Sequence, residues 1–199
     1  MKAAQARRGA SQFVYLEFLD PAVRRFLTDL RNALTGKIKR SPVHITVRGP
    51  YSSPPDKGYL TELRENLWGM GVYIGGAGTF EAGDGFVVYL KAQSPIFEQI
   101  WWKPDYPTER YQRSPHVTVF ETSRKRDALE VERFLRRERI EIHTFGLDLV
   151  VRTRRQYELF EPSMENIPVR FPAFLERIRV KAGILGRARM LTTSFVPAN

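Results

Sequence analysis

One four-residue pattern occurs twice in the chain and constrains its fold more than any other feature. Residues 44–47 read His-Ile-Thr-Val, and residues 116–119 read His-Val-Thr-Val. Polar and aliphatic side chains alternate in both, which is typical of a β-strand with one buried face. Because successive side chains of a strand point to opposite faces, each histidine shares a face with the threonine two positions later. The chain has only 3 histidines, and the pattern places two of them beside a hydroxyl group.

The segments around the two patterns follow a similar order. Each pattern is preceded by a helical segment and followed by a second helical segment and further strands. We therefore predict an α+β fold with two pseudo-symmetric lobes, each an antiparallel sheet with flanking helices. Facing each other about an approximate twofold axis, the lobes would bring the two His-Thr strands to the walls of one central cleft.

Periodicity and turn residues define the individual elements. Asp20 and Pro21 are typical of a helix start and Gly36 of a helix end, so we expect a helix over 21–35. Residues 48–55 are rich in glycine, proline and serine, which predicts a loop directly after the first His-Thr strand. The other expected strands are 12–20, 72–74, 79–81, 86–91, 140–152 and 156–160, and the other expected helices are 59–70, a short one from 94, and 122–138.

The charge of the chain favours a polyanionic partner. Its 32 Lys and Arg against 22 Asp and Glu give a net charge of +10 at pH 7. A positive field concentrates phosphates and speeds their encounter with the protein, so RNA or a small nucleotide is the expected partner class. The plainer explanation, that many small soluble proteins are basic, remains open.

Composition also limits the compartment and the cofactors. The chain has 0 cysteines, which excludes disulfides, thiol nucleophiles and thiolate metal sites. No apolar run approaches the ~20 residues of a membrane-spanning helix, and residues 1–10 are basic without a following apolar signal core. We expect a cytoplasmic monomer with no membrane partner. Residues 1–10 are expected to be flexible, and residues 163–199 to form a basic extension with a helix that packs on the domain.

Two histidines that face each other can supply both halves of general acid-base catalysis. Imidazole has an ordinary pKa of about 6.5, so one ring can accept a proton near neutral pH while the other donates one. Hydrolysis of a phosphodiester needs both transfers, from the attacking water and to the leaving alkoxide. The neighbouring threonine hydroxyls can donate hydrogen bonds to the non-bridging phosphate oxygens.

This pair of motifs resembles the two-histidine phosphoesterases, the superfamily of RNA 2′,3′-cyclic phosphodiesterases and 2′-5′ RNA ligase-like proteins. The family motif of histidine, hydrophobic residue, threonine or serine, and hydrophobic residue is met in full at both places. The resemblance covers about residues 12–162, which we take as one domain over 11–162. It implies a bilobal α+β fold and metal-independent hydrolysis of 2′,3′-cyclic or 2′-5′ phosphodiesters without a cofactor. It also implies that the first histidine is the acid and the second the base, and the implied catalytic residues are His44, Thr46, His116 and Thr118.

Basic and aromatic residues near the motifs are candidates for substrate binding. Arg48 and Tyr51 follow the first motif directly, Tyr111 precedes the second, and Tyr157 lies in the last expected strand. Aromatic rings stack on bases and cations attract phosphates, so we expect these four residues to hold the substrate. For each tyrosine, packing between the lobes is the alternative.

The same residues allow other interpretations. Buried structural histidines, or a non-catalytic RNA or nucleotide binder that retains the cleft, would explain the motifs without catalysis. A metal site is disfavoured because neither motif carries an acidic ligand.

His143 lacks the threonine and is expected to be structural. Residues 75–78 (Gly-Gly-Ala-Gly) open no helix and lack a following Lys-Ser or Lys-Thr, so they predict a bend or bulge rather than a phosphate loop.

Overall fold

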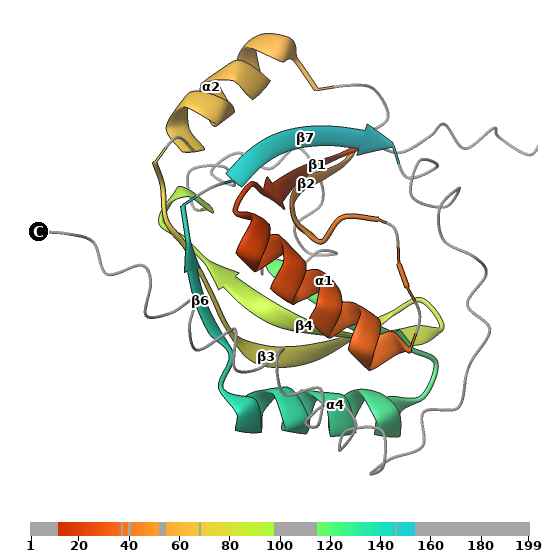
Figure 1. Cartoon of the computed structure of the whole chain (residues 1–199). Helices are drawn as coiled ribbons and strands as arrows, with labels where there is room; N and C mark the ends of the chain where they lie inside the picture. The colour runs from red at the N-terminus through yellow and green to blue at the C-terminus, as the bar shows by residue number, and fades with distance from the viewer. Residues whose placement is uncertain are drawn as a thin grey trace, which may run out of the picture.

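The computed structural model describes residues 12–36, 38–39, 41–51, 55–67, 69–97, 115–145 and 147–153. Three helices and seven strands lie within them (Figure 1). The strands are β1 (Gln12–Phe18), β2 (His44–Tyr51), β3 (Val72–Ala82), β4 (Gly85–Gln93), β5 (His116–Thr122), β6 (Glu141–Thr144) and β7 (Leu147–Thr153). The helices are α1 (Pro21–Thr35), α2 (Lys57–Leu67) and α4 (Lys125–Glu138). None of the helices in these ranges is long and apolar enough to cross a membrane.

The strands form one curled antiparallel sheet in the order β6-β3-β4-β5-β2-β1-β7. The α+β class is confirmed, whereas the described strands lie in one sheet and two separate lobes are not shown. β6 and β7 lie on opposite edges of this sheet, yet β6 ends at Thr144 and β7 begins at Leu147. Three residue steps span at most roughly 11 Å. The sheet must therefore curl, so that the end of β6 comes close to the start of β7.

The start and the end of helix α1 are both set by residues next to them in the sequence. The carboxylate of Asp20 accepts hydrogen bonds from the backbone N–H groups of Ala22 (2.8 Å) and Val23 (3.3 Å) and so caps the helix. Gly36 ends it in the left-handed conformation, at φ 66°. The predicted helix over 21–35 is confirmed.

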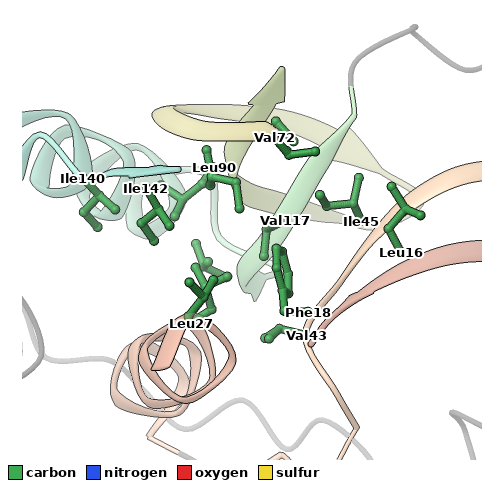
Figure 2. Packing of buried hydrophobic residues seen from close by; sticks show 14 of the residues in the cluster. Leu16, Phe18, Leu27, Val43, Ile45, Val72, Leu90, Val117, Ile140 and Ile142 are labelled. Carbon is green, nitrogen blue, oxygen red and sulfur yellow. The ribbon is translucent and has the colours of Figure 1, made fainter. Parts of the chain in front are cut away.

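One hydrophobic cluster joins the helices to a single face of the sheet. Alternate strand residues enter it, among them Leu16 and Phe18 of β1, Ile45 of β2 and Val117 of β5 (Figure 2). Leu27 of α1 reaches the same cluster, as do the buried residues of α2 and α4. The alternation that predicted the His-Thr strands is therefore real: their aliphatic residues are core, and the histidines and threonines lie on the opposite face, here named the His-Thr face.

The structure differs from the predicted elements at several places. A loop was expected from residue 48, but β2 continues to Tyr51. Its last residues pair with β1, where Arg48 lies opposite Val14 and Tyr51 opposite Gln12, with a register shift between these pairs. The expected strand over 140–152 is two strands, β6 and β7, on opposite edges of the sheet. The bulge predicted at 75–78 is confirmed, because the register shifts between Ile74 and Ala77 and Gly76 has φ 69°. It lies inside one long strand, β3, and not between two strands over 72–74 and 79–81. The elements expected in 98–114 and 154–199 lie outside the described residues, as do residues 1–10, for which flexibility was predicted.

Candidate functional site

The two His-Thr strands lie side by side. β2 and β5 run antiparallel with Ile45 opposite Val117, and both of these side chains are fully buried. Because opposed residues of an antiparallel pair step in opposite directions, each histidine lies across from the threonine of the other strand. The resulting pairs are His44 with Thr118 and Thr46 with His116.

The four polar side chains therefore form a compact square on the His-Thr face. All four are half-buried. Histidines at diagonal positions of such a square have backbones roughly 7–8 Å apart, which lets one phosphate group lie between two imidazoles. The electrostatic effect of His116 on His44 is large enough to lower the pKa of His44. The structure thus brings together all four residues that the sequence predicted as catalytic.

His44 has a defined hydrogen-bond partner. Its Nδ1 lies 3.1 Å from the backbone carbonyl oxygen of Pro42. A carbonyl oxygen only accepts, so Nδ1 carries the proton and donates it, and in the neutral ring Nε2 is left as an acceptor. Tyr15 of β1 covers the ring, with centroids 4.2 Å apart.

The surroundings of His44 keep its ring uncharged. Burial is the main cause that lowers the pKa of His44, from 6.5 to about 4. The positive charges of Arg31, His116 and Arg152 act in the same direction, and only the hydrogen bond to Pro42 raises the pKa. At neutral pH, His44 is therefore a proton acceptor.

His116 lies among aromatic rings and beside a lysine. The centroids of Tyr89 and Phe80 lie 4.8 and 5.3 Å from that of the imidazole. Tyr89 lies flat over Gly78, where a Cβ atom would come within 2.5 Å of the tyrosine oxygen, so only glycine leaves room for this ring position. Lys91 is the register partner of His116 on β4 and is exposed, which places a positive charge beside the square.

An ion pair borders the square on the other side. Glu17 of β1 is the register partner of His44, and its Oε1 accepts from Arg152 of β7 at Nε (2.8 Å) and at the terminal nitrogen Nη2 (2.7 Å). A two-point contact of this kind fixes the plane of the guanidinium. Arg152 is thereby held beside His44.

The four expected substrate-binding residues are only partly placed. Tyr51 ends β2, is half-buried and packs against the hydrophobic core. The backbone of Arg48 is opposite Val14 of β1, and its side chain lies outside what the structure describes. Tyr111 and Tyr157 also lie outside the described residues. The role of these four residues stays a prediction.

Other neighbours of the histidines were not singled out from the sequence. Tyr15, Glu17, Tyr89 and Arg152 flank the square from β1, β4 and β7. Their only signal is polar or aromatic character at every second position of a strand, which shows that a residue faces away from the core without showing which strands are neighbours. His143, by contrast, is exposed on edge strand β6 and packs against Tyr73, at 4.9 Å between centroids.

Two further findings concern metal ions and relatives. Across the described ranges, no group of three or more His, Cys, Asp or Glu side chains is placed to hold a metal ion. The chain gives no match to protein-family models, to curated proteins or to solved structures. What the site does must therefore be inferred from its own geometry and chemistry.

Proposed function

We propose that the protein is a phosphodiesterase that hydrolyses 2′,3′-cyclic or 2′-5′ phosphodiester bonds of RNA ends or small nucleotides by acid-base catalysis with two histidines. The observation that carries the proposal is the square of His44, Thr46, His116 and Thr118 on adjacent antiparallel strands. Each histidine has a hydroxyl group directly across from it. This is the donor and acceptor set that hydrolysis of a phosphodiester requires.

The proposed roles of the histidines follow from the hydrogen bond of His44. Its Nε2 accepts a proton from the attacking water as the water oxygen forms its bond to phosphorus. The bond from phosphorus to the leaving ribose oxygen breaks, and this oxygen takes a proton from His116. The pKa of His44, lowered to about 4 by burial, favours this direction over the reverse one that the family resemblance implies. No metal ion is needed, because both proton transfers are assigned to side chains.

Thr46 and Thr118 are proposed to hold the phosphate. Their hydroxyl groups donate to the non-bridging oxygens, which carry additional negative charge in the transition state. This contact also keeps the reacting ester in line between the imidazoles. Lys91 adds a positive charge beside the site, and Arg152, although paired with Glu17, adds another.

A two-lobe arrangement, as in the two-histidine phosphoesterases, is part of the proposal. β1 and β7 pair along their whole length, from Gln12 with Thr153 to Phe18 with Leu147. Within the described residues, β2 and β5 are joined in register only by Ile45 and Val117. So narrow a junction suits two half-sheets, β6-β3-β4-β5 and β2-β1-β7, that meet at the square of histidines and threonines.

The test is hydrolysis by the purified protein in excess EDTA. The substrates are a 2′,3′-cyclic-phosphate RNA end, a 2′-5′ oligoadenylate, a 3′-5′ dinucleotide and cyclic oligonucleotides. His44→Ala and His116→Ala are each expected to lower turnover by ~10²–10⁴-fold, the usual worth of a general acid or base. His143→Ala, which removes the remaining histidine on edge strand β6, is the matched control and should leave turnover unchanged.

The contrary outcomes are distinct. Binding of a panel member without turnover would contradict an enzymatic function and favour a non-catalytic nucleotide-binding module. Activity that EDTA abolishes, or that survives both substitutions, would place the active site elsewhere.

A further inference from the structure

Arg31 is a buried cation on an otherwise apolar helix face. It lies on α1 among Leu27, Leu30 and Leu34, and only 6% of its surface is exposed. Removing a guanidinium from water is costly unless its N–H groups find acceptors. A hydrophobic side chain would fill this position at lower cost, so the charge at residue 31 requires an explanation.

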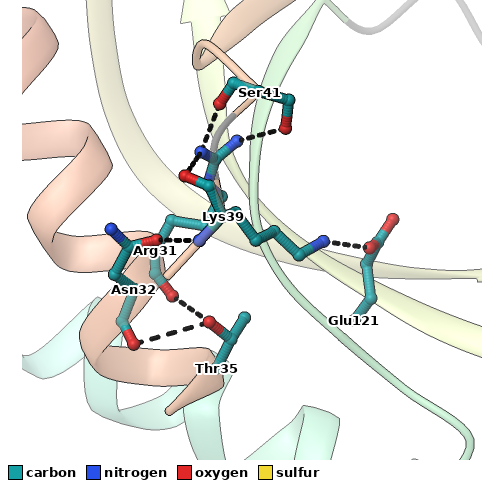
Figure 3. A network of polar contacts seen from close by, with 6 residues as sticks. All are labelled: Arg31, Asn32, Thr35, Lys39, Ser41 and Glu121. Atoms are coloured by element: carbon teal, nitrogen blue, oxygen red, sulfur yellow. Dashed lines mark hydrogen bonds and ion pairs between the residues drawn. The ribbon is translucent and has the colours of Figure 1, made fainter. Parts of the chain in front are cut away.

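The guanidinium of Arg31 holds the segment that leads into β2. It donates to the carbonyl oxygen of Ser41, to the Ser41 hydroxyl at 3.5 Å and to the carbonyl oxygen of Lys39 at 3.3 Å (Figure 3). The same segment is tied to β5, because Lys39 Nζ lies 3.0 Å from Glu121 Oε2. Both contacts fix the backbone immediately before the first motif.

The position of Ser41 controls the orientation of His44. Holding the Ser41 carbonyl fixes the peptide plane between Ser41 and Pro42, and the proline ring fixes the next φ near −65°. Only the ψ angle of Pro42 then remains to orient its carbonyl group. This is the carbonyl that accepts the proton of His44 Nδ1, at 3.1 Å.

We propose that Arg31 is the positioning residue of His44: through Ser41 and Pro42 it holds the imidazole in the tautomer with the proton on Nδ1 and directs the unprotonated Nε2 to the His-Thr face. The catalytic consequence rests on the proposed function. The tautomer does not, since it is a property of the free protein. A purely structural arginine would stabilise α1 without affecting which ring nitrogen carries the proton.

The charged groups near His44 come from several elements. Arg31 lies on α1, His116 on β5 and Arg152 on β7, and all three lower the pKa of His44, after burial as the first cause. Glu17, on β1, lies next to His44 but is paired with Arg152. Loss of the Arg31 charge acts to raise the pKa of His44, whereas loss of the hydrogen bond to Pro42 acts to lower it. The tautomer is therefore the direct readout of positioning.

The experiment is ¹⁵N NMR of the histidine rings at neutral pH, followed by a pH titration. The native protein is expected to show His44 protonated at Nδ1 alone. In Arg31→Met, we expect a mixture of tautomers. In Arg31→Lys, which keeps the charge but loses the forked contact, we expect an intermediate change. Arg25→Met is the matched control, because Arg25 lies on the same helix with 77% of its side chain exposed.

Hydrolysis measurements on the same variants test the catalytic part. A misplacement of about 1 Å can cost ~10²-fold in rate, so kcat of Arg31→Met should fall by ten-fold or more while KM changes less. A native His44 protonated at Nε2, or a folded Arg31→Met with an unchanged tautomer, would overturn the positioning role. The first of these needs no variant and holds even if Arg31→Met does not fold. A tautomer that responds to Arg31 in a protein without hydrolytic activity would retain the positioning role and reject the proposed function instead.

Discussion

At the scale of single residues, the site is defined by how differently its two histidines are surrounded. His44 donates through Nδ1 to Pro42 and lies against Tyr15, next to the Glu17–Arg152 ion pair. His116 is flanked by aromatic rings and by the exposed Lys91. Two motifs of the same pattern thus offer two different imidazoles. General acid-base catalysis needs such a difference, since one ring has to accept a proton while the other donates.

The lowered pKa of His44 predicts an unusual pH profile. A base works only when unprotonated, and its folded-state pKa of about 4 keeps it so well below the ordinary value of 6.5. We expect kcat/KM to persist as the pH falls below 6 and to drop only near pH 4. Steady-state rates across pH 3.5–8, with a check that the protein remains folded, measure this. An acidic limb near pH 6.5 would contradict the role of His44 as the base.

The same shift predicts how stability depends on pH. Because the folded-state pKa is depressed, the unfolded chain takes up a proton first as the pH falls. The contribution of His44 is therefore fully present above pH 6.5 and is lost as the pH falls from 6.5 through about 4. Urea unfolding at several pH values measures the free energy of unfolding. Within this window, it should fall more steeply with decreasing pH in the native protein than in His44→Gln. Parallel pH dependences would show that His44 titrates normally.

At the scale of elements, α1 serves the core and the site together. Its apolar face packs into the hydrophobic cluster, and Arg31 on the same face holds the segment before β2. The helix start is fixed by Asp20, which accepts from two backbone N–H groups.

Asp20→Ala is accordingly expected to destabilise the protein by ~1 kcal/mol, the usual cost of losing an N-cap. Chemical denaturation measures the change. Asp29→Ala removes a carboxylate from the exposed side of the same helix, where it faces Arg25 at 4.0 Å, and should cost less than half as much. Equal losses in both variants would mean that the cap contributes nothing beyond its charge.

At the scale of the whole molecule, the pairing of β2 with β5 places the two His-Thr strands side by side in one sheet. Ile45 and Val117 form the registered pair, and both lie in the hydrophobic cluster. The four site residues are on the other face of these same two strands. Packing beneath the sheet therefore sets the spacing of the histidines above it.

Ile45→Val tests this dependence with the loss of one methylene group. We expect a cost of ~0.5–1.5 kcal/mol, as for other buried Ile→Val changes, together with reduced turnover. Ile38→Val is the matched control, because Ile38 is 84% exposed, and it should change neither quantity measurably. Thermal unfolding and hydrolysis assays on both variants decide. A stable Ile45→Val protein with full activity would mean that the spacing is set elsewhere.

The sequence by itself determined several features that depend on near neighbours along the chain. The cap and the apolar stripe of α1 follow from residues 20–36, and the alternation at 44–47 and 116–119 showed which residues face the core and which share the histidine face. The α+β class and the catalytic candidates were predicted on this basis. These signals are local because hydrogen bonds of a helix turn and the alternation of a strand involve residues two to four positions apart.

Only the tertiary structure decided which strands are neighbours. No local pattern shows that β2 pairs with β5 and places each histidine opposite a threonine, or that residues 140–152 divide between the two edges of one curled sheet. The same holds for Arg31, whose partners lie eight and ten residues along the chain, and for Arg152, which meets Glu17 across β1 and β7. Strand pairing and buried charge depend on the packing of distant segments, because backbone groups and guanidinium donors bind whichever acceptors the fold brings within reach.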